Sequence, residues 1–140
     1  MINRKQQIVA AIHDLSGFGR CSLAVIIPVL SSMGIQCCPV PTAVLSTHTG
    51  GFENIAIKDL TDYIGAALSQ YKKLGIEFDS VYSGFLASAE QIDHCLDFFA
   101  AYKDSLKVVD PVMGDHGRPY RTYTPELCGR MGLSLIHISE

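Results

Sequence analysis

The sequence is poor in basic residues. Its 140 residues include 11 Lys plus Arg against 14 Asp plus Glu, which gives a formal net charge of -3. A protein that binds nucleic acid needs a basic stripe to neutralise the phosphate backbone. The composition therefore argues against nucleic acid as a partner and favours a small soluble ligand.

Long apolar runs are also absent. The longest, Leu23 to Leu30, is far shorter than the roughly 20 residues of a membrane-spanning helix and contains Pro28. Near the N-terminus, Ile8 to Ile12 is too short for the apolar region of a signal peptide and is followed by His13 and Asp14. We therefore expect no membrane partner, no export and a cytoplasmic location.

Patterns typical of disulfides, zinc sites and common nucleotide sites are missing as well. The five cysteines are odd in number and include no C-x-x-C pair, so we expect reduced thiols. The five histidines form no cluster of zinc spacing. There is no G-x-x-x-x-G-K-[ST] loop, and after Gly17-Phe18-Gly19 the third glycine of a dinucleotide fingerprint is replaced by Ser22. We expect neither a P-loop nor a nicotinamide site.

Strand and helix patterns alternate along the chain. A continuous apolar run at residues 8–12 predicts a strand buried on both faces, residues 80–84 predict a short strand, and residues 106–109 predict another short buried strand. Residues 36–47 contain Pro39 and Pro41 and predict an irregular strand that emerges near residues 43–45. Such alternation predicts an α/β fold with a mostly parallel sheet, helices on both faces and a ligand crevice at the carboxyl ends of the strands.

Three segments predict helices. Residues 21–33 are apolar nearly all round and precede Gly34, which predicts a buried helix kinked at Pro28. Apolar residues from Ile57 to Tyr71 recur at helical spacing and are closed by Gly75. A capping box, Ser88-Ala89-Glu90-Gln91, opens the third helix.

Polar, glycine-rich segments follow three of the expected strands, at residues 13–19, 46–52 and 110–117. Asp110 and Asp115 share one short loop and could hold Mg²⁺ beside a triphosphate, although Asp, Pro and Gly are also ordinary turn residues. Asp14 and Ser16 could hydrogen-bond a polar ring substituent or cap the helix that follows. Because all three segments follow expected strands, we predict that they form one site.

Two further residues have two interpretations each. His48 could hydrogen-bond a ligand or the backbone. Phe85, just past a strand end, could stack on an aromatic substrate or belong to the core. The residues alone leave both choices open.

Five motifs, in order, resemble the pyridoxal kinase family, and closely its pyridoxamine kinase members. They are AIHDLSGFG at 11–19, THTG at 47–50, YSGFL at 82–86, SAEQ at 88–91 and VDPVMGD at 109–115. The resemblance runs from about residue 8 to about residue 128. It implies that residues 1–130 are the N-terminal part of a ribokinase-like kinase domain, truncated in this chain, and that residues 131–140 are a tail unlike the family.

The resemblance also implies roles for individual residues. The family binds the vitamin B6 ring in the loops after the first strands, with ATP and Mg²⁺ alongside. Matched by position, the substrate-binding residues are Asp14, Ser16, Thr49, Gly50 and Phe85. Asp14 stands where the family commonly has a serine, so the ring contact stays open between Asp14 and Ser16.

The nucleotide side follows from the same match. Asp110 and Asp115 match acidic positions beside ATP and the metal, and Tyr123 matches a tyrosine near the nucleotide phosphates. The implied partners are a B6 vitamer and ATP, and the full-length form is expected to be a homodimer. A hydroxymethylpyrimidine kinase of the same architecture is the alternative enzyme.

The implied reaction transfers the γ-phosphoryl group of ATP to the 5′ hydroxymethyl of the ring, with an aspartate accepting the hydroxyl proton. The family carries that aspartate in a Gly-Thr-Gly-Asp stretch, and neither this stretch nor the family's Asn-x-x-Glu strand end occurs in the 140 residues. No catalytic residue is therefore assigned. We expect this chain alone to be inactive and poorly stable as a monomer, or to be a non-catalytic fragment that at most binds a ligand.

Overall fold

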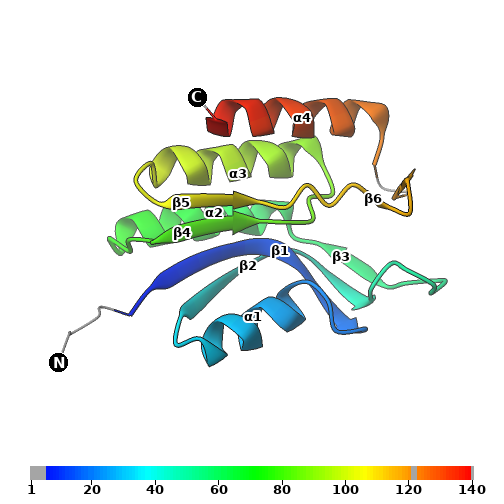
Figure 1. The fold of residues 1–140 in the computed structure, drawn as a ribbon, viewed down its shortest axis with the longest axis horizontal. Helices are drawn as coiled ribbons and strands as arrows, with labels where there is room; N and C mark the ends of the chain where they lie inside the picture. The colour runs from blue at the N-terminus through cyan, green and yellow to red at the C-terminus, as the bar shows by residue number, and fades with distance from the viewer. Residues whose placement is uncertain (1–5, 121–122, 140) are drawn as a thin grey trace.

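The computed structural model describes residues 6–120 and 123–139 and contains a five-stranded sheet (Figure 1). The strands are β1 (Ile8–Phe18), β2 (Gln36–Thr47), β3 (Ile57–Asp59), β4 (Ser80–Ser83) and β5 (Leu106–Val109). Their order across the sheet is β3-β2-β1-β4-β5, with β3 antiparallel to β2 and all other neighbours parallel. The mostly parallel α/β architecture expected from the sequence is confirmed.

Helices cover both faces of this sheet (Figure 1). They are α1 (Leu23–Ser32), α2 (Thr61–Lys73), α3 (Ala89–Ala101) and α4 (Pro125–Ser139). Helix α1 packs on β1 and β2, α2 and α3 lie over the opposite face, and α4 packs against the outer side of α3. A small antiparallel hairpin of β6 (Gly114–Asp115) and β7 (Arg118–Pro119) connects β5 to α4. None of the described helices has the length and apolarity needed to cross a membrane.

The main core lies between the sheet and the α2–α3 layer. Ala10 and Ile12 of β1 are fully buried there with Ile64 of α2 and Phe98 of α3. Because successive residues of a strand point to opposite faces, Ala11 is directed toward the α1 side, where it is also fully buried. Strand β1 is thus covered on both faces, as its continuous apolar sequence predicts.

The predicted helix boundaries are largely confirmed. Gly34 and Gly75 follow α1 and α2 and take positive φ angles of 76° and 64°, a conformation that a glycine adopts without steric cost. The Ser88 side chain accepts a hydrogen bond from the Gln91 amide at 3.2 Å, as a capping residue should. The Gln91 side chain does not complete the capping box, because its Oε1 accepts from the Ala87 amide instead.

Two strands are longer or more regular than their sequences suggest. Residues 13–19 were expected to be a loop, but β1 continues to Phe18, which pairs with Thr47 of β2. The polar residues at the end of β1 lack the apolar pattern that predicts a strand, yet their backbone groups continue the pairing with β2. Strand β2 also pairs with β1 through Pro39 and Pro41. These prolines are two residues apart, so their missing N–H groups fall on one edge, and β3 pairs with β2 only beyond them, at residues 43–45.

Three expectations about burial or extent were wrong. Helix α1 buries only Leu23, and Val29 is 49% exposed, because one side of the helix meets the sheet while its other apolar side faces outward. Ile57 lies in β3, where it pairs with Leu45, so α2 begins only at Thr61. Leu106 of β5 was expected to be buried but is 66% exposed, since β5 is the last strand of the described sheet.

Candidate functional site

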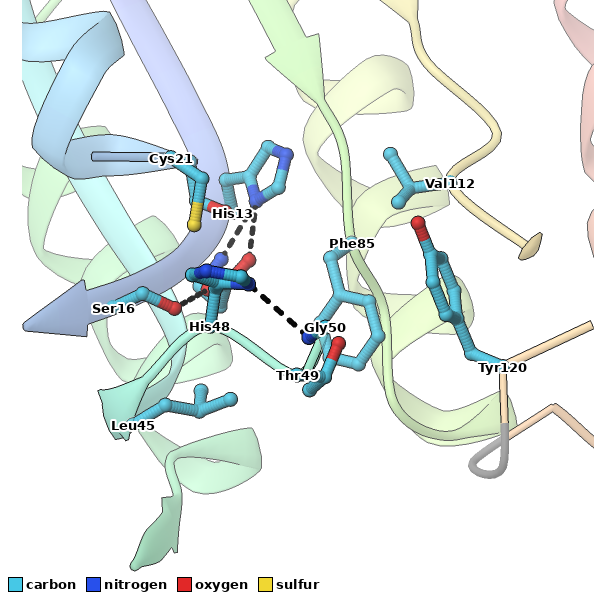
Figure 2. Close-up of a pocket in the computed structure, with 12 residues that line it drawn as sticks. His13, Ser16, Cys21, Leu45, His48, Thr49, Gly50, Phe85, Val112 and Tyr120 are labelled. Atoms are coloured by element: carbon cyan, nitrogen blue, oxygen red, sulfur yellow. Dashed lines mark hydrogen bonds and ion pairs between the residues drawn. The ribbon is translucent and has the colours of Figure 1, made fainter. Parts of the chain in front are cut away.

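The parallel strands end together at one edge of the sheet, where a cavity of about 320 Å³ opens (Figure 2). Its lining comes from the end of β1, the loop after β2, the segment after β4 and the region around the β6–β7 hairpin. Ligands of open parallel sheets bind in the crevice outside the carboxyl ends of the strands. The volume is at the lower end of the roughly 300–1,000 Å³ typical of ligand pockets, which suits a small ring compound.

Asp14 enters this cavity at an irregularity of the sheet. The register between β1 and β2 shifts there, so that Asp14 alone on β1 lies opposite both Thr42 and Ala43 on β2. Bulges of this kind redirect side chains and are common next to binding sites. Asp14 and Ser16 are two residues apart on β1, and both line the cavity at or just beyond this shift.

A polar network surrounds the Asp14 carboxylate. Its Oδ1 lies 2.7 Å from His13 Nδ1, and the Ser16 hydroxyl donates to its Oδ2 at 2.8 Å. Burial would raise the pKa of Asp14, but hydrogen bonds from His13, Ser22 and Ser16 outweigh it and hold the pKa below its ordinary value of 3.8. The carboxylate is therefore ionised at neutral pH.

This network argues against the capping interpretation of Asp14 and Ser16. Ser22, the residue before α1, makes no side-chain capping bond, and the first-turn amides of Val25 and Ile26 donate to the Ser22 carbonyl. The Asp14 carboxylate instead interacts with the side chains of His13, Ser22 and Ser16. Asp14 and Ser16 therefore line the cavity rather than cap α1.

Two glycines let histidine rings approach the strand ends. A Cβ at Gly84 would lie 1.9 Å from the His13 ring, and a Cβ at Gly19, whose φ is 121°, would lie 1.9 Å from the His48 ring. Any side chain at these positions would displace the rings. His48 Nδ1 accepts a hydrogen bond from the Gly50 amide at 3.1 Å, which fixes the loop that carries Thr49.

Aromatic side chains form the opposite wall. Phe85 and Tyr120 face the His13 and Ser16 side of the cavity in Figure 2. Phe85 is only 8% exposed and also meets Tyr123 edge to face, with ring centroids 6.4 Å apart. Phe85 therefore belongs to the core cluster and also lines the cavity, and its stacking on an aromatic ligand stays a prediction. The cavity combines an aromatic wall with an ionised carboxylate, a pattern that suits a flat polar ring.

Several solved structures that are similar to this chain are named as small-molecule kinases. A protein from Bacteroides thetaiotaomicron that is named as a phosphomethylpyrimidine kinase matches with a TM-score of 0.89 and 46% identity, over 96% of this chain and 47% of that one. Another crystal form under that name, solved with pyridoxal, matches with a TM-score of 0.88 and 47% identity, over 94% and 46% of the two chains.

Pyridoxal kinase from Lactobacillus plantarum matches with a TM-score of 0.83 and 29% identity, over 92% of this chain and 46% of that one. This is a pyridoxal kinase-like chain. Its fold is ribokinase-like and truncated, since it spans about half the length of the solved structures that it matches. Pyridoxal kinase from Leishmania donovani, solved with ADP and pyridoxamine, shares the fold at a TM-score of 0.78 and 19% identity, over 94% and 48% of the two chains. Neither a protein-family model nor a curated protein matches the chain.

The pyridoxal kinase-like chain brings together all five residues expected to bind substrate. Asp14, Ser16, Thr49, Gly50 and Phe85 line the same cavity. They come from three separate segments of the sequence and meet because β1, β2 and β4 end at one edge. Their roles in binding stay a prediction.

The residues expected on the nucleotide side do not line this cavity. Asp110 is exposed at the end of β5, where its amide donates to the Ser83 carbonyl at 2.8 Å. It therefore lies at the same sheet edge, one strand beyond the cavity. Asp115 belongs to β6, and its side chain is outside the described part of the structure. Tyr123 is buried against Phe85, and burial raises the pKa of its hydroxyl to about 12.

The described carboxylates do not form a metal site by themselves. Within residues 6–120 and 123–139, no group of three or more His, Cys, Asp or Glu side chains could hold a metal ion. Asp110 could supply one oxygen ligand to Mg²⁺, which usually keeps several waters and binds one or two carboxylates together with substrate phosphates. These residues alone do not fit a resident metal.

Sequence reasoning missed several lining residues. His13 could have been found, because it directly precedes Asp14 at the end of an apolar strand. Cys21 and Val112 line the cavity from the turn before α1 and the segment after β5. Tyr120 had no local signal, since it reaches the cavity only because the β6–β7 hairpin folds back over the sheet edge.

Proposed function

We propose that the chain supplies the ring-binding part of an ATP-dependent kinase that phosphorylates pyridoxal, pyridoxamine or pyridoxine on the 5′ hydroxymethyl group. The observation that supports it most is the convergence of Asp14, Ser16, Thr49, Gly50 and Phe85 on one cavity. The 47%-identical protein solved with pyridoxal adds to it.

The cavity offers the contacts that a pyridine ring requires. The exposed face of Phe85 and the nearby Tyr120 ring can enclose a flat aromatic ligand. The Asp14 carboxylate accepts hydrogen bonds, and the Thr49 hydroxyl can both donate and accept. A B6 ring carries hydroxyl groups at its rim, so it can satisfy these groups while its faces replace water against the aromatic wall.

The proposed reaction is a phosphoryl transfer. The oxygen of the ring hydroxymethyl forms a bond to the γ-phosphorus of ATP, the bond from that phosphorus to the β–γ bridging oxygen breaks, and ADP leaves. The hydroxyl proton must pass to a base, and this chain contains no Gly-Thr-Gly-Asp stretch to supply it. ADP in the Leishmania donovani protein supports a nucleotide co-substrate. The cavity residues bind and orient the ring, and Asp110 lies on the side where the nucleotide is expected.

A hydroxymethylpyrimidine substrate is the second candidate. The 46%-identical protein is named as a phosphomethylpyrimidine kinase, and that name favours it. The Asp14 carboxylate also suits it, because an exocyclic amino group on a pyrimidine can donate to an ionised acceptor. The two candidates differ in which ring the same cavity prefers.

Equilibrium binding distinguishes them. Titration calorimetry of the 140-residue chain with pyridoxal, pyridoxamine and hydroxymethylpyrimidine should show one site for a B6 vitamer, and Phe85→Ala should weaken it. The Tyr63→Ala variant, at an exposed aromatic residue of α2 that does not line this cavity, serves as the matched control. Tight binding of the pyrimidine with no heat from either vitamer would establish the second candidate, and no binding of any of the three would refute both.

A further inference from the structure

Gln91 is a fully buried polar residue on the first turn of α3, away from the cavity lining. Its side chain lies within hydrogen-bond distance of four groups, three of which share the two N–H donors of Nε2. Oε1 accepts from the Ala87 amide at 2.8 Å, and Nε2 lies 3.0 Å from the Thr42 carbonyl, 2.9 Å from the Thr61 hydroxyl and 3.2 Å from Asp59 Oδ2. One amide therefore ties together β2, the start of α2 and the segment before α3.

The segment that Gln91 holds is the one that carries Phe85. Residues 84–87 connect β4 to α3 and belong to no helix or strand, and at their start the Gly84 amide donates to the Ile12 carbonyl of β1 at 2.9 Å. Two side chains form hydrogen bonds with the backbone of this segment, one at Phe85 and one at Ala87. The Thr42 hydroxyl donates to the Phe85 carbonyl at 3.1 Å, and Gln91 accepts from the Ala87 amide.

Packing alone does not account for a glutamine here. Burying a primary amide has a desolvation cost, which is recovered only when its donors and acceptor are paired. An apolar side chain of similar size would fill the same space without that desolvation cost. A fully paired buried network instead specifies one geometry for the segments that it joins. The geometry specified is the path of residues 84–87 relative to β2.

We propose that Gln91 and Thr42 are positioning residues that hold Phe85 against the cavity, so that its ring presents a fixed face to the ligand. Thr42 fixes the carbonyl of Phe85 itself, and Gln91 fixes the amide two residues later. Both residues act through Phe85 and neither lines the cavity. The effect on ligand affinity rests on the proposed function, whereas the effect on Phe85 does not.

Fluorine NMR of the 140-residue chain tests the positioning directly. 4-Fluorophenylalanine is incorporated at the six phenylalanines, and the Phe85 signal is assigned by its loss in Phe85→Leu. Gln91→Met removes the amide at similar volume, and Thr42→Val removes only the hydroxyl. Each should broaden or split the ligand-free Phe85 signal and leave the other signals in place. Thr42→Ser restores the hydroxyl and should restore one sharp signal, and Gln70→Met on the exposed side of α2 is the matched control.

Pyridoxal titrations of the same variants give the second measurement. Loss of one or two buried hydrogen bonds predicts binding weaker by about five- to tenfold for Gln91→Met and about threefold for Thr42→Val. An unchanged Phe85 signal in both variants overturns the inference, whatever happens to affinity. If Gln91→Met fails to fold, the Thr42→Val and Thr42→Ser pair decides alone. A disturbed Phe85 signal in a chain that binds no pyridoxal supports the positioning role and counts against the proposed function.

Discussion

The β1–β2 side of the sheet and the β4–β5 side are covered very differently. Strand β1 lies between α1 on one face and the α2–α3 layer on the other, and Ala10, Ala11 and Ile12 are fully buried. On β5, Leu106 and Val108 are 66% and 41% exposed. The register places them beside Ser80 and Tyr82 of β4, on a face that no described helix covers in Figure 1.

The described residues thus bury both faces of β1 but leave one face of β5 exposed. The covered side supports the cavity, since Asp14, Ser16 and Thr49 extend from strands with a full core beneath them. The open side ends in an unpaired strand with apolar side chains, a surface that favours association with other chains. The proposed ring site therefore extends from the covered side to Phe85 after β4, and Asp110, the candidate for the nucleotide side, lies at the end of the open strand.

The largest expected effect concerns turnover. The 140-residue chain should phosphorylate pyridoxal with ATP at a rate many orders of magnitude below that of the Lactobacillus plantarum pyridoxal kinase that it resembles, because positioning and electrostatic stabilisation supply most of the rate in phosphoryl transfer. The chain carries the ring cavity without the family's Gly-Thr-Gly-Asp stretch. A coupled assay for ADP measures both proteins. Comparable rates would show that a base lies within this chain, with Asp14 and Asp110 as the first candidates to test.

Core truncations should distinguish the two sides of the sheet by stability. Ile12→Ala leaves a cavity in the doubly covered strand and should lower the free energy of unfolding by about 2–5 kcal/mol. Leu106→Ala on the open face should change it by less than about 0.5 kcal/mol, since most of its side chain is already in water. Urea unfolding followed by circular dichroism measures both. Equal losses would mean that the open face is buried in solution, for example by self-association.

Self-association is expected through that open strand. Sedimentation velocity should show concentration-dependent species, and Leu106→Lys together with Val108→Lys should shift them toward the monomer, because charged side chains on an edge strand oppose pairing. The control places lysines at Val25 and Val29, which are exposed on α1. If the control removes association and the β5 variant does not, the α1 surface is the contact.

How far the sequence predicted these features depends on the kind of signal. Strands β1, β4 and β5 were found from short apolar runs, and the ends of α1 and α2 from Gly34 and Gly75, because these signals are local. Residues at strand ends were correctly expected to share an edge, since parallel strands all end on one side. That rule brought Asp14, Thr49 and Phe85 to one cavity without any knowledge of distances.

What could not be predicted depends on contacts between distant segments. The extension of β1 through polar residues up to Phe18 exists because Thr47 pairs with it. Ile57 fits a helical period by chance, and only its pairing with Leu45 places it in β3. The exposure of Val29 and Leu106 depends on which face of an apolar element is covered, and periodicity does not encode that. The division at residue 130 stays a prediction, and α4 runs across it to Ser139.

Ligand selectivity should also divide along the two sides. Phe85→Ala should weaken pyridoxal binding by about tenfold and leave MgATP binding nearly unchanged, because a lost aromatic contact is worth about 1 kcal/mol beyond its area. Asp110→Asn should weaken MgATP binding and leave pyridoxal binding nearly unchanged. This variant removes a carboxylate charge that could bind Mg²⁺, and Asp110 does not line the cavity. Titration calorimetry with each ligand measures the pair. If both variants affect both ligands equally, the proposed division between ring side and nucleotide side is wrong.

The smallest expected effect is the pH dependence contributed by Asp14. Its pKa in the folded chain lies below the ordinary value of 3.8, so the unfolded chain binds the proton more tightly than the folded chain does. The stabilisation is therefore fully present above the unfolded pKa and is lost as pH falls through the folded pKa. Asp14→Asn should lower stability by a constant amount at pH 6 and above, and the difference from the wild type should shrink below about pH 4. Thermal unfolding at closely spaced pH values measures this difference, which isolates Asp14 from the other carboxylates. A difference that grows on acidification would mean that the Asp14 pKa is raised, as burial alone would make it, and the His13 and Ser16 hydrogen bonds would then not be the dominant influence at the cavity.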